Sequence, residues 1–156
     1  MIGITLRPLR VAWHAGVLAG LFCLALGPAS AAPPVTVSQP WFRYLLPNIP
    51  AGGYLTLDNH TPQTVHLTGA SSSACGMLML HKTVHENGVE KMVAVPEVTI
   101  PAHGSFSFHP GFYHIMCMKP HMKVGETVPV TLTFDHTPPL TIDFPVYGAM
   151  GKTSDK

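Results

Sequence analysis

Short runs of β-branched and aromatic residues recur along most of the chain, separated by Gly, Pro, Asn, Asp and Ser. Beyond residue 31 no stretch has the 3.6-residue periodicity of an amphipathic helix. Many short strands with regular turn signals are typical of a β-sandwich or a β-barrel, so we predict an all-β fold. The runs that predict strands are residues 35–37, 54–57, 64–68, 77–84, 89–95, 105–108, 112–118, 128–134 and 140–146.

The N-terminal residues have a different pattern, that of a secretory signal peptide. Arg7 and Arg10 precede a mainly apolar stretch at 11–26, and Ala29-Ser30-Ala31 fits an A-x-A cleavage site. We expect cleavage after Ala31, because the apolar stretch is short for a membrane span; an uncleaved anchor is the alternative. The expected organisation is a signal peptide at 1–31, a β domain at 32–147 and a flexible tail at 148–156, with no stable membrane insertion after cleavage.

Composition narrows the class of function. The chain has 156 residues, enough for one domain of ordinary size, and 14 Gly and 16 Pro argue against a helical bundle. With 9 Lys and Arg against 8 Asp and Glu, nothing in the charge favours a nucleic acid as partner. The chain is instead unusually rich in histidine and methionine, with 10 His and 8 Met, and both residue types bind metals.

One turn sets a testable register. Asn87-Gly88 lies between two β-prone runs and indicates a two-residue type I′ hairpin. In that hairpin Met92 faces Thr83, and Thr83 shares a face with His81 because side chains alternate along a strand. Met92 and His81 are then diagonal neighbours, about 7–8 Å apart at the backbone and within reach of one metal ion.

A second pair follows in the run at 112–118. His114 and Met116 share one face, while Ile115 and Cys117 point to the other. Two histidines and two methionines from three strands could therefore meet, if the fold brings the two faces together. We expect the other methionines of these runs, Met77, Met79 and Met118, to pack in the core.

His81, Met92, His114 and Met116 have the spacing H-x10-M-x21-H-x-M. This is the motif of the periplasmic copper chaperones called PCuAC, and a chance match in a chain of this composition has odds of about 2 in 1,000. The segments MLMLHKTVHENGVEKM, PGFYHIMCM and VPVTLTF also resemble that family, and the similarity covers about residues 35–146. In two respects the chain departs from the family pattern: Lys82 replaces a common acidic residue, and the His- and Met-rich C-terminal extension is missing.

The resemblance implies a cupredoxin-like Greek-key β-sandwich or barrel that binds one Cu(I) through the four motif residues. It implies a monomeric periplasmic carrier, not an enzyme, that delivers copper to an acceptor. Family members supply the binuclear copper site of cytochrome c oxidase, alongside thioredoxin-like copper assembly factors. The ligand chemistry agrees independently, because soft thioethers favour Cu(I) over hard cations.

Cys75 and Cys117 lie outside the motif, and their state stays open between a disulfide and two buried thiols. Export favours the disulfide. Strand alternation opposes it, because an unbroken strand puts Cys75 on the face of His81 and Cys117 on the face opposite His114. A bulge or a strand start after Gly76 would remove that conflict.

Three other functions compete with a copper carrier. A blue-copper electron-transfer protein would use Cys117 as thiolate, with His121 and, as further candidates, His81 and Met122. An enzyme is disfavoured, because no nucleophile motif and no carboxylate paired with a histidine stand out. A metal-free adhesion module would leave the four-residue motif unexplained.

Overall fold

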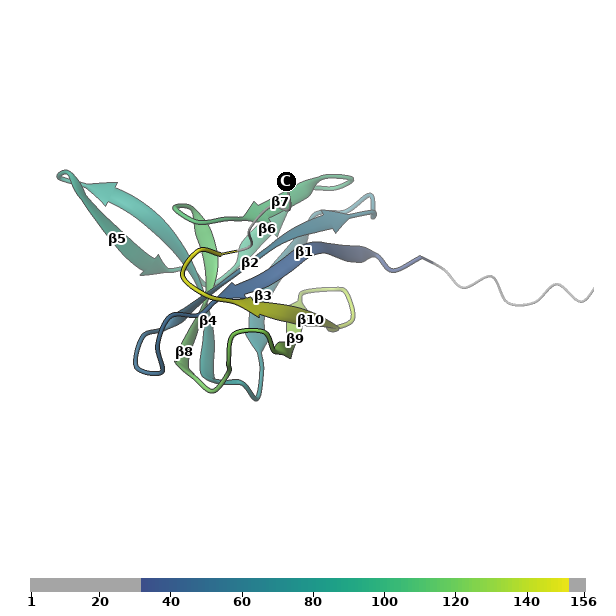
Figure 1. Cartoon of the computed structure of the whole chain (residues 1–156). Helices are drawn as coiled ribbons and strands as arrows, with labels where there is room; N and C mark the ends of the chain where they lie inside the picture. Colours follow the sequence, from purple (N-terminus) through teal and green to yellow (C-terminus); the bar gives the residue numbers. More distant parts are fainter. Residues whose placement is uncertain (1–31, 152–156) are drawn as a thin grey trace, which may run out of the picture. The chain divides into compact units, whose positions relative to one another are not determined.

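Each of the nine predicted runs overlaps a strand in the computed structural model, which describes residues 32–151. The predicted signal peptide and the end of the predicted tail lie outside the described residues. The described part contains ten strands and no helix that could span a membrane. They are β1 (Val35–Arg43), β2 (Ala51–Asn59), β3 (Val65–Ser71), β4 (Cys75–Glu86), β5 (Val89–Ala94), β6 (Val98–Ile100), β7 (Ser105–Phe108), β8 (Tyr113–Pro120), β9 (Thr127–Phe134) and β10 (Leu140–Tyr147) (Figure 1).

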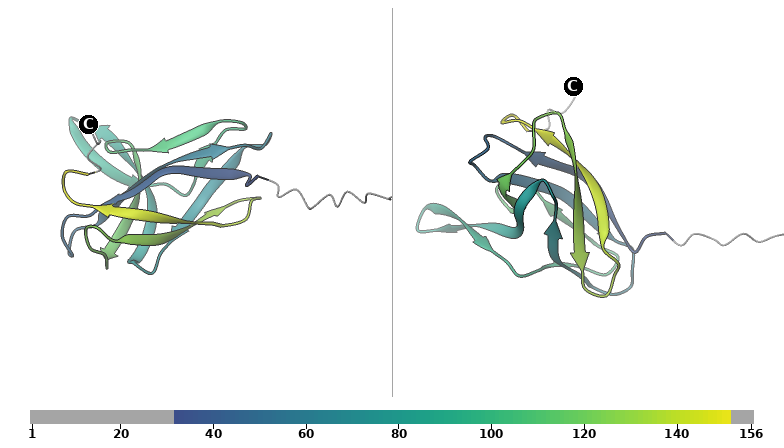
Figure 2. Two further views of the ribbon diagram at one scale, coloured as in Figure 1. Left: turned by 45° about the vertical axis from the view of Figure 1, so that its right-hand side comes forward. Right: turned by 90° about the horizontal axis from the view of Figure 1, so that it is seen from below.

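The strands form one curled sheet in the order β5-β4-β8-β2-β1-β10-β9-β3-β6, with β7 paired to β2. All the pairings are antiparallel except that of β1 with β10, where Phe42 lies opposite Val146. Figure 2 shows the curl of the sheet and the β4–β5 hairpin that extends to one side of it. The all-β architecture predicted from the sequence is confirmed.

The core fills the inside of this curl. In β9 every second residue is buried and the residues between them, such as Thr127 and Thr133, face outward. Phe42 of β1 and Phe144 of β10 are fully buried, with ring centroids 5.1 Å apart, and join the two halves of the sheet. Apolar area removed from water by such side chains is the main stabilising contribution to the fold.

Two stretches are strand where the sequence pattern did not indicate it. Strand β1 continues past Pro40, a residue that cannot donate to the ladder and normally ends a strand. Here the register shifts between Ser38 and Trp41, and Gln39 has a φ of 51°, so a bulge accommodates the proline. Strand β6 has only three residues, between Pro96 and Pro101, and is too short to give a pattern.

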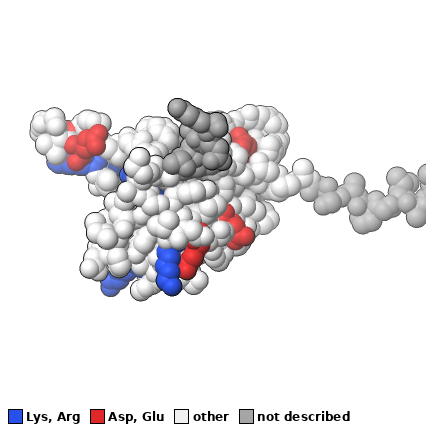
Figure 3. Space-filling model, viewed as in Figure 1, with Lys and Arg blue, Asp and Glu red and all other residues white. Residues whose placement is uncertain are grey.

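The β4–β5 hairpin has the predicted register. His81 lies opposite Ala94 and Thr83 opposite Met92. Asn87 and Gly88 have φ values of 52° and 77°, as a type I′ turn requires. Charged side chains gather near the turn, where Lys91 pairs with Glu86, while much of the face in Figure 3 is uncharged.

The structure joins Cys75 and Cys117 in a disulfide, with their Cα atoms 5.4 Å apart. The alternation argument against this bond assumed a regular strand. Lys119 has a φ of 49°, and the β4–β8 ladder lacks the Gly76–Lys119 pair that would separate Cys75–Pro120 from Met77–Met118. This irregularity lies between the rung of Cys75 and the rung of Cys117. Strand alternation therefore does not carry through from one cysteine to the other, and it no longer argues against the disulfide.

Candidate metal centre

The two motif histidines face each other across adjacent strands. Strand β8 lies between β4 and β2, and its register places His114 directly opposite His81. Residues opposite each other in an antiparallel pair point to the same face of the sheet. The ring centroids of His81 and His114 are 5.8 Å apart, and the ring planes are nearly perpendicular, at 80°.

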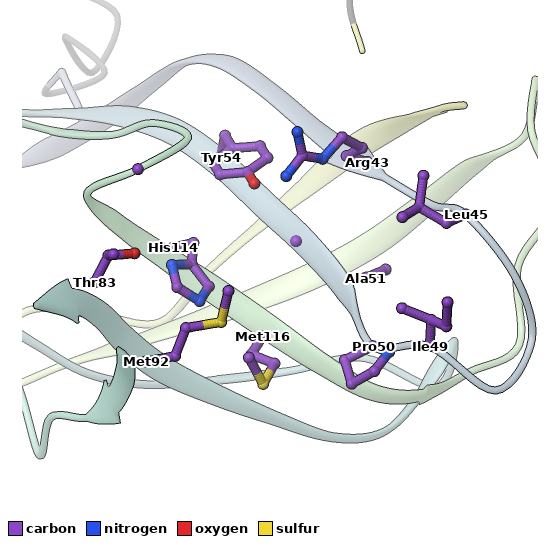
Figure 4. A pocket seen from close by; sticks show the side chains of 12 residues that line it. Arg43, Leu45, Ile49, Pro50, Ala51, Tyr54, Thr83, Met92, His114 and Met116 are labelled. Carbon is purple, nitrogen blue, oxygen red and sulfur yellow. The ribbon is translucent and has the colours of Figure 1, made fainter. Parts of the chain in front are cut away.

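The two motif methionines lie on the same face. Met92 of β5 is opposite Thr83, diagonal to His81, and Met116 is two residues beyond His114 on β8. Met92, His114 and Met116 line a pocket of about 330 Å³. Figure 4 shows these three side chains clustered, with Arg43 and Tyr54 across the pocket. All four motif side chains therefore converge on one region from three strands.

Both imidazoles are buried although they face outward, with only 8% of His81 and 5% of His114 exposed. His81 Nδ1 and His114 Nε2 have no hydrogen-bond partner among residues 32–151. A buried polar atom without a partner is costly, and native structures contain few of them. These two nitrogens are free to accept an external group, and a metal ion bound by their lone pairs would compensate for that cost.

Electrostatics favour the metal-binding form of both rings. Burial lowers the pKa of His81. Burial also lowers the pKa of His114, as do the positive charge of Arg43 and the neighbouring His81, while a hydrogen bond to the backbone of Phe112 acts in the opposite direction. Both rings are therefore neutral at pH 7, and neutral imidazole is the form that binds metals.

The far side of the pocket was not predicted from the sequence. Arg43 of β1 and Gly52 of β2 lie opposite each other, and Gly52 is also opposite Met116. The Arg43 guanidinium lies 5.9 Å from the centre of the Tyr54 ring. A Cβ on Gly52 would lie 2.7 Å from the Tyr54 hydroxyl oxygen, so glycine allows the phenol to lie across the strand. The adjacent glycines Gly52-Gly53 inside a strand were the available signal for such a close approach.

The residues considered for a blue-copper centre do not come together in the structure. Because Cys117 is bonded to Cys75, it has no thiolate to offer to a blue-copper centre. His121 and Met122 line a separate hollow with Tyr44 and Pro120, away from His114.

The expectation of core packing is wrong for Met77, which is 57% exposed, whereas Met79 and Met118 are half-buried.

Comparison with known proteins assigns the chain to a family. Residues 35–146 match the family model described as "LpqE-like: Putative lipoprotein LpqE-like". The chain belongs to the LpqE-like family. It is also 36% identical over 140 residues to "Putative lipoprotein Lxx21020" of Leifsonia xyli subsp. xyli, an alignment that covers 83% of this chain and 84% of that protein.

Two solved structures with bound copper are similar to this LpqE-like chain. The solution structure of CuI-DR1885 from Deinococcus radiodurans is 30% identical, covers 83% of this chain and 87% of that one, and has a TM-score of 0.59. The copper-bound PCuAC domain from PmoF2 is 20% identical, covers 76% and 97% of the two chains, and has a TM-score of 0.62. The fold is cupredoxin-like, which confirms the predicted fold class.

Proposed function

We propose that this protein is a Cu(I) metallochaperone whose ligands are His81, Met92, His114 and Met116. The observation that carries the proposal is the pair of buried imidazoles with unpartnered ring nitrogens, which share a sheet face with two thioethers. The similarity to Cu(I)-bound DR1885 supports the same metal and oxidation state.

The donor set suits a metal that has to be released. Two imidazoles and two thioethers are neutral, so the charge of Cu(I) stays uncompensated and binding is weaker than to thiolates. Thioethers do not protonate, which keeps part of the ligand set available in mild acid. Met92 is 62% exposed and lies on a strand at the end of the sheet, so an acceptor protein could replace this ligand first.

The biological setting is inferred from the family and the N-terminal sequence. The lipoprotein names of the family and of the Leifsonia relative support export, as does the signal-peptide pattern at 1–31. We infer a periplasmic, monomeric, non-enzymatic carrier made of the β domain at 32–147 and the tail at 148–156. Its acceptor is a copper protein, with a cytochrome c oxidase subunit or a thioredoxin-like copper assembly factor as candidates. We infer no nucleic-acid partner and no membrane insertion after cleavage.

Anaerobic Cu(I) titration against a chromophoric chelator, with X-ray absorption of the loaded protein, tests the ligand set. We expect one tightly bound Cu(I) with nitrogen and sulfur neighbours, no strong visible band, and at least about tenfold weaker binding in His114→Ala. His85→Ala is the matched control, because His85 is on the same face of β4 but 69% exposed and paired with Glu90. Equal affinity of the His114→Ala variant and the wild type would contradict the proposal.

A blue-copper electron carrier is the alternative function, and the colour of the oxidised protein distinguishes it from a Cu(I) chaperone. Such a centre needs a cysteine thiolate, which gives the oxidised protein an intense colour. The Cys75–Cys117 disulfide disfavours it. An intense visible band in the Cu(II)-loaded protein that disappears in Cys117→Ser would move the function to electron transfer.

A further inference from the structure

Three methionines outside the motif continue the line of soft side chains away from the histidine pair. On β4 and β8, His81 is opposite His114, Met79 is opposite Met116, and Met77 is opposite Met118. Successive rungs that are two residues apart point to the same face, so these six side chains form two adjacent columns. Only three of the six belong to the motif, and the remaining three are Met77, Met79 and Met118.

The positions of these methionines do not match ordinary packing. Outward-facing positions of a sheet normally carry polar residues, and in β9 three of the four are threonines, Thr127, Thr131 and Thr133. Met77 is 57% exposed, and Met79 and Met118 are half-buried. Methionine has no particular preference for strands, so three of them beside each other on an exposed face suggest a use for the sulfur atoms.

Their spacing suits a common ligand. Directly opposite Cβ atoms, as in Met77 and Met118, are about 4.5–5.5 Å apart, and rungs two residues apart are about 7 Å apart along the strand. Three rotatable bonds let each thioether move toward a shared point. Such a set has no charge and no imidazole, so it selects soft monovalent metal ions and binds them weakly.

We propose that Met77, Met79 and Met118 bind a second Cu(I) ion, more weakly than the histidine pair, with Met116 between the two sites. The second site extends the proposed copper function, but its donors differ from the four motif ligands. It gives copper a place on the exposed face from which to enter or leave the buried centre, since Met79 and Met116 form the rung next to the histidines.

Titration of the full-length protein with Ag(I), a redox-stable soft monovalent ion, tests this inference through NMR of ¹³C-methyl-labelled methionines. We expect the first equivalent to shift the methyl signals of Met92 and Met116. The second equivalent, bound at least about tenfold more weakly, should shift those of Met77, Met79 and Met118. The double variant Met77→Leu with Met118→Leu should bind one equivalent, with its first-step affinity unchanged.

Two controls make the outcome decisive. Met150 is 87% exposed and outside the columns, so its methyl signal measures adventitious binding to a single thioether, and Met150→Leu should still bind two equivalents. Shifts of Met77, Met79 and Met118 no larger than that of Met150 would overturn the second site, as would two equivalents bound by the double variant. If Ag(I) shifts the methyl signals of the three outer methionines but not those of Met92 and Met116, the second site stands and the four-ligand centre is wrong.

The variants are chosen to preserve the fold. Leucine keeps the volume and the apolar character of methionine, and the single variant Met77→Leu, at the most exposed position, tests the site with the least risk to folding.

Discussion

His81 and His114 are held in surroundings that keep them neutral and ready to bind a metal. Each ring is buried on the outer face of the sheet, and each has a nitrogen without a hydrogen-bond partner in the described part of the chain. Most structural histidines in a sheet satisfy both nitrogens or expose one to water. A buried ring nitrogen without a partner is costly, and in the proposed centre a bound ion would offset that cost in both rings.

The lowered pKa values of the two histidines predict how the copper-free protein responds to acid. Since both folded-state pKa values lie below 6.5, the unfolded chain takes up protons first as the pH falls. The free energy of unfolding should therefore decrease as the pH falls through 6.5, and this contribution should level off below the folded-state pKa values.

Urea unfolding at about pH 8 and about pH 5 measures this effect, and His114→Ala should lose part of the difference. An identical pH dependence in the variant and the wild type would show that His114 does not titrate abnormally.

Arg43 should weaken Cu(I) binding. Its charge lowers the pKa of His114, and the same charge opposes a cation bound to that ring. In Arg43→Gln we expect Cu(I) affinity to rise a few-fold, the effect of about 0.5–1 kcal/mol between charges in largely aqueous surroundings. Chelator competition at low and high salt measures it, with Lys123→Gln as a control for net charge. Equal gains in both variants would mean that the position of Arg43 is unimportant.

The β4–β5 hairpin is the element that brings Met92 to the centre. Strand β5 is at the end of the sheet and pairs with β4 alone, so the two-residue turn sets its register. A slip of one residue would turn Met92 to the other face. The hairpin can therefore be altered with little effect on the core, which lies elsewhere.

Deletion of Gly88 should weaken Cu(I) binding by more than it lowers the stability of the fold. Without Gly88 the type I′ turn cannot form, and β5 has to pair in a new register. Cu(I) affinity and the denaturant midpoint should be measured together, with Asn87→Asp as a control that keeps the turn type. Full Cu(I) affinity in the deletion variant would show that this turn does not position Met92.

Some strand pairings could be predicted from the sequence and others could not. The pairing of β4 with β5 was predictable because a two-residue turn fixes it locally. The pairing of His81 with His114 was not, because it joins segments far apart in the chain and depends on how the sheet curls. Arg43 and Tyr54 reach the pocket through long-range pairings in the same way, and the positive φ at Lys119, which removes the objection to the disulfide, left no pattern in the sequence.

In the domain as a whole, the Cys75–Cys117 disulfide ties the strands of the site to the core. Cys117 lies between Met116 and Met118 along β8, and its own side chain is fully buried on the opposite face. Cys75 begins β4, the strand that carries His81. The bond therefore braces the two strands from which three of the four proposed ligands come, without using either sulfur as a ligand.

Removal of this bond should reduce stability and leave the centre able to bind copper. A crosslink that spans 42 residues is expected to contribute about 2–4 kcal/mol, mainly by restricting the unfolded chain. The double variant Cys75→Ala with Cys117→Ala should therefore unfold at a lower urea concentration, with Cu(I) affinity within about threefold of the wild type, since β4 and β8 stay paired through their backbone ladder. Loss of Cu(I) binding in a variant that is still folded, as judged by circular dichroism, would mean that the disulfide positions the ligands and does more than stabilise the fold.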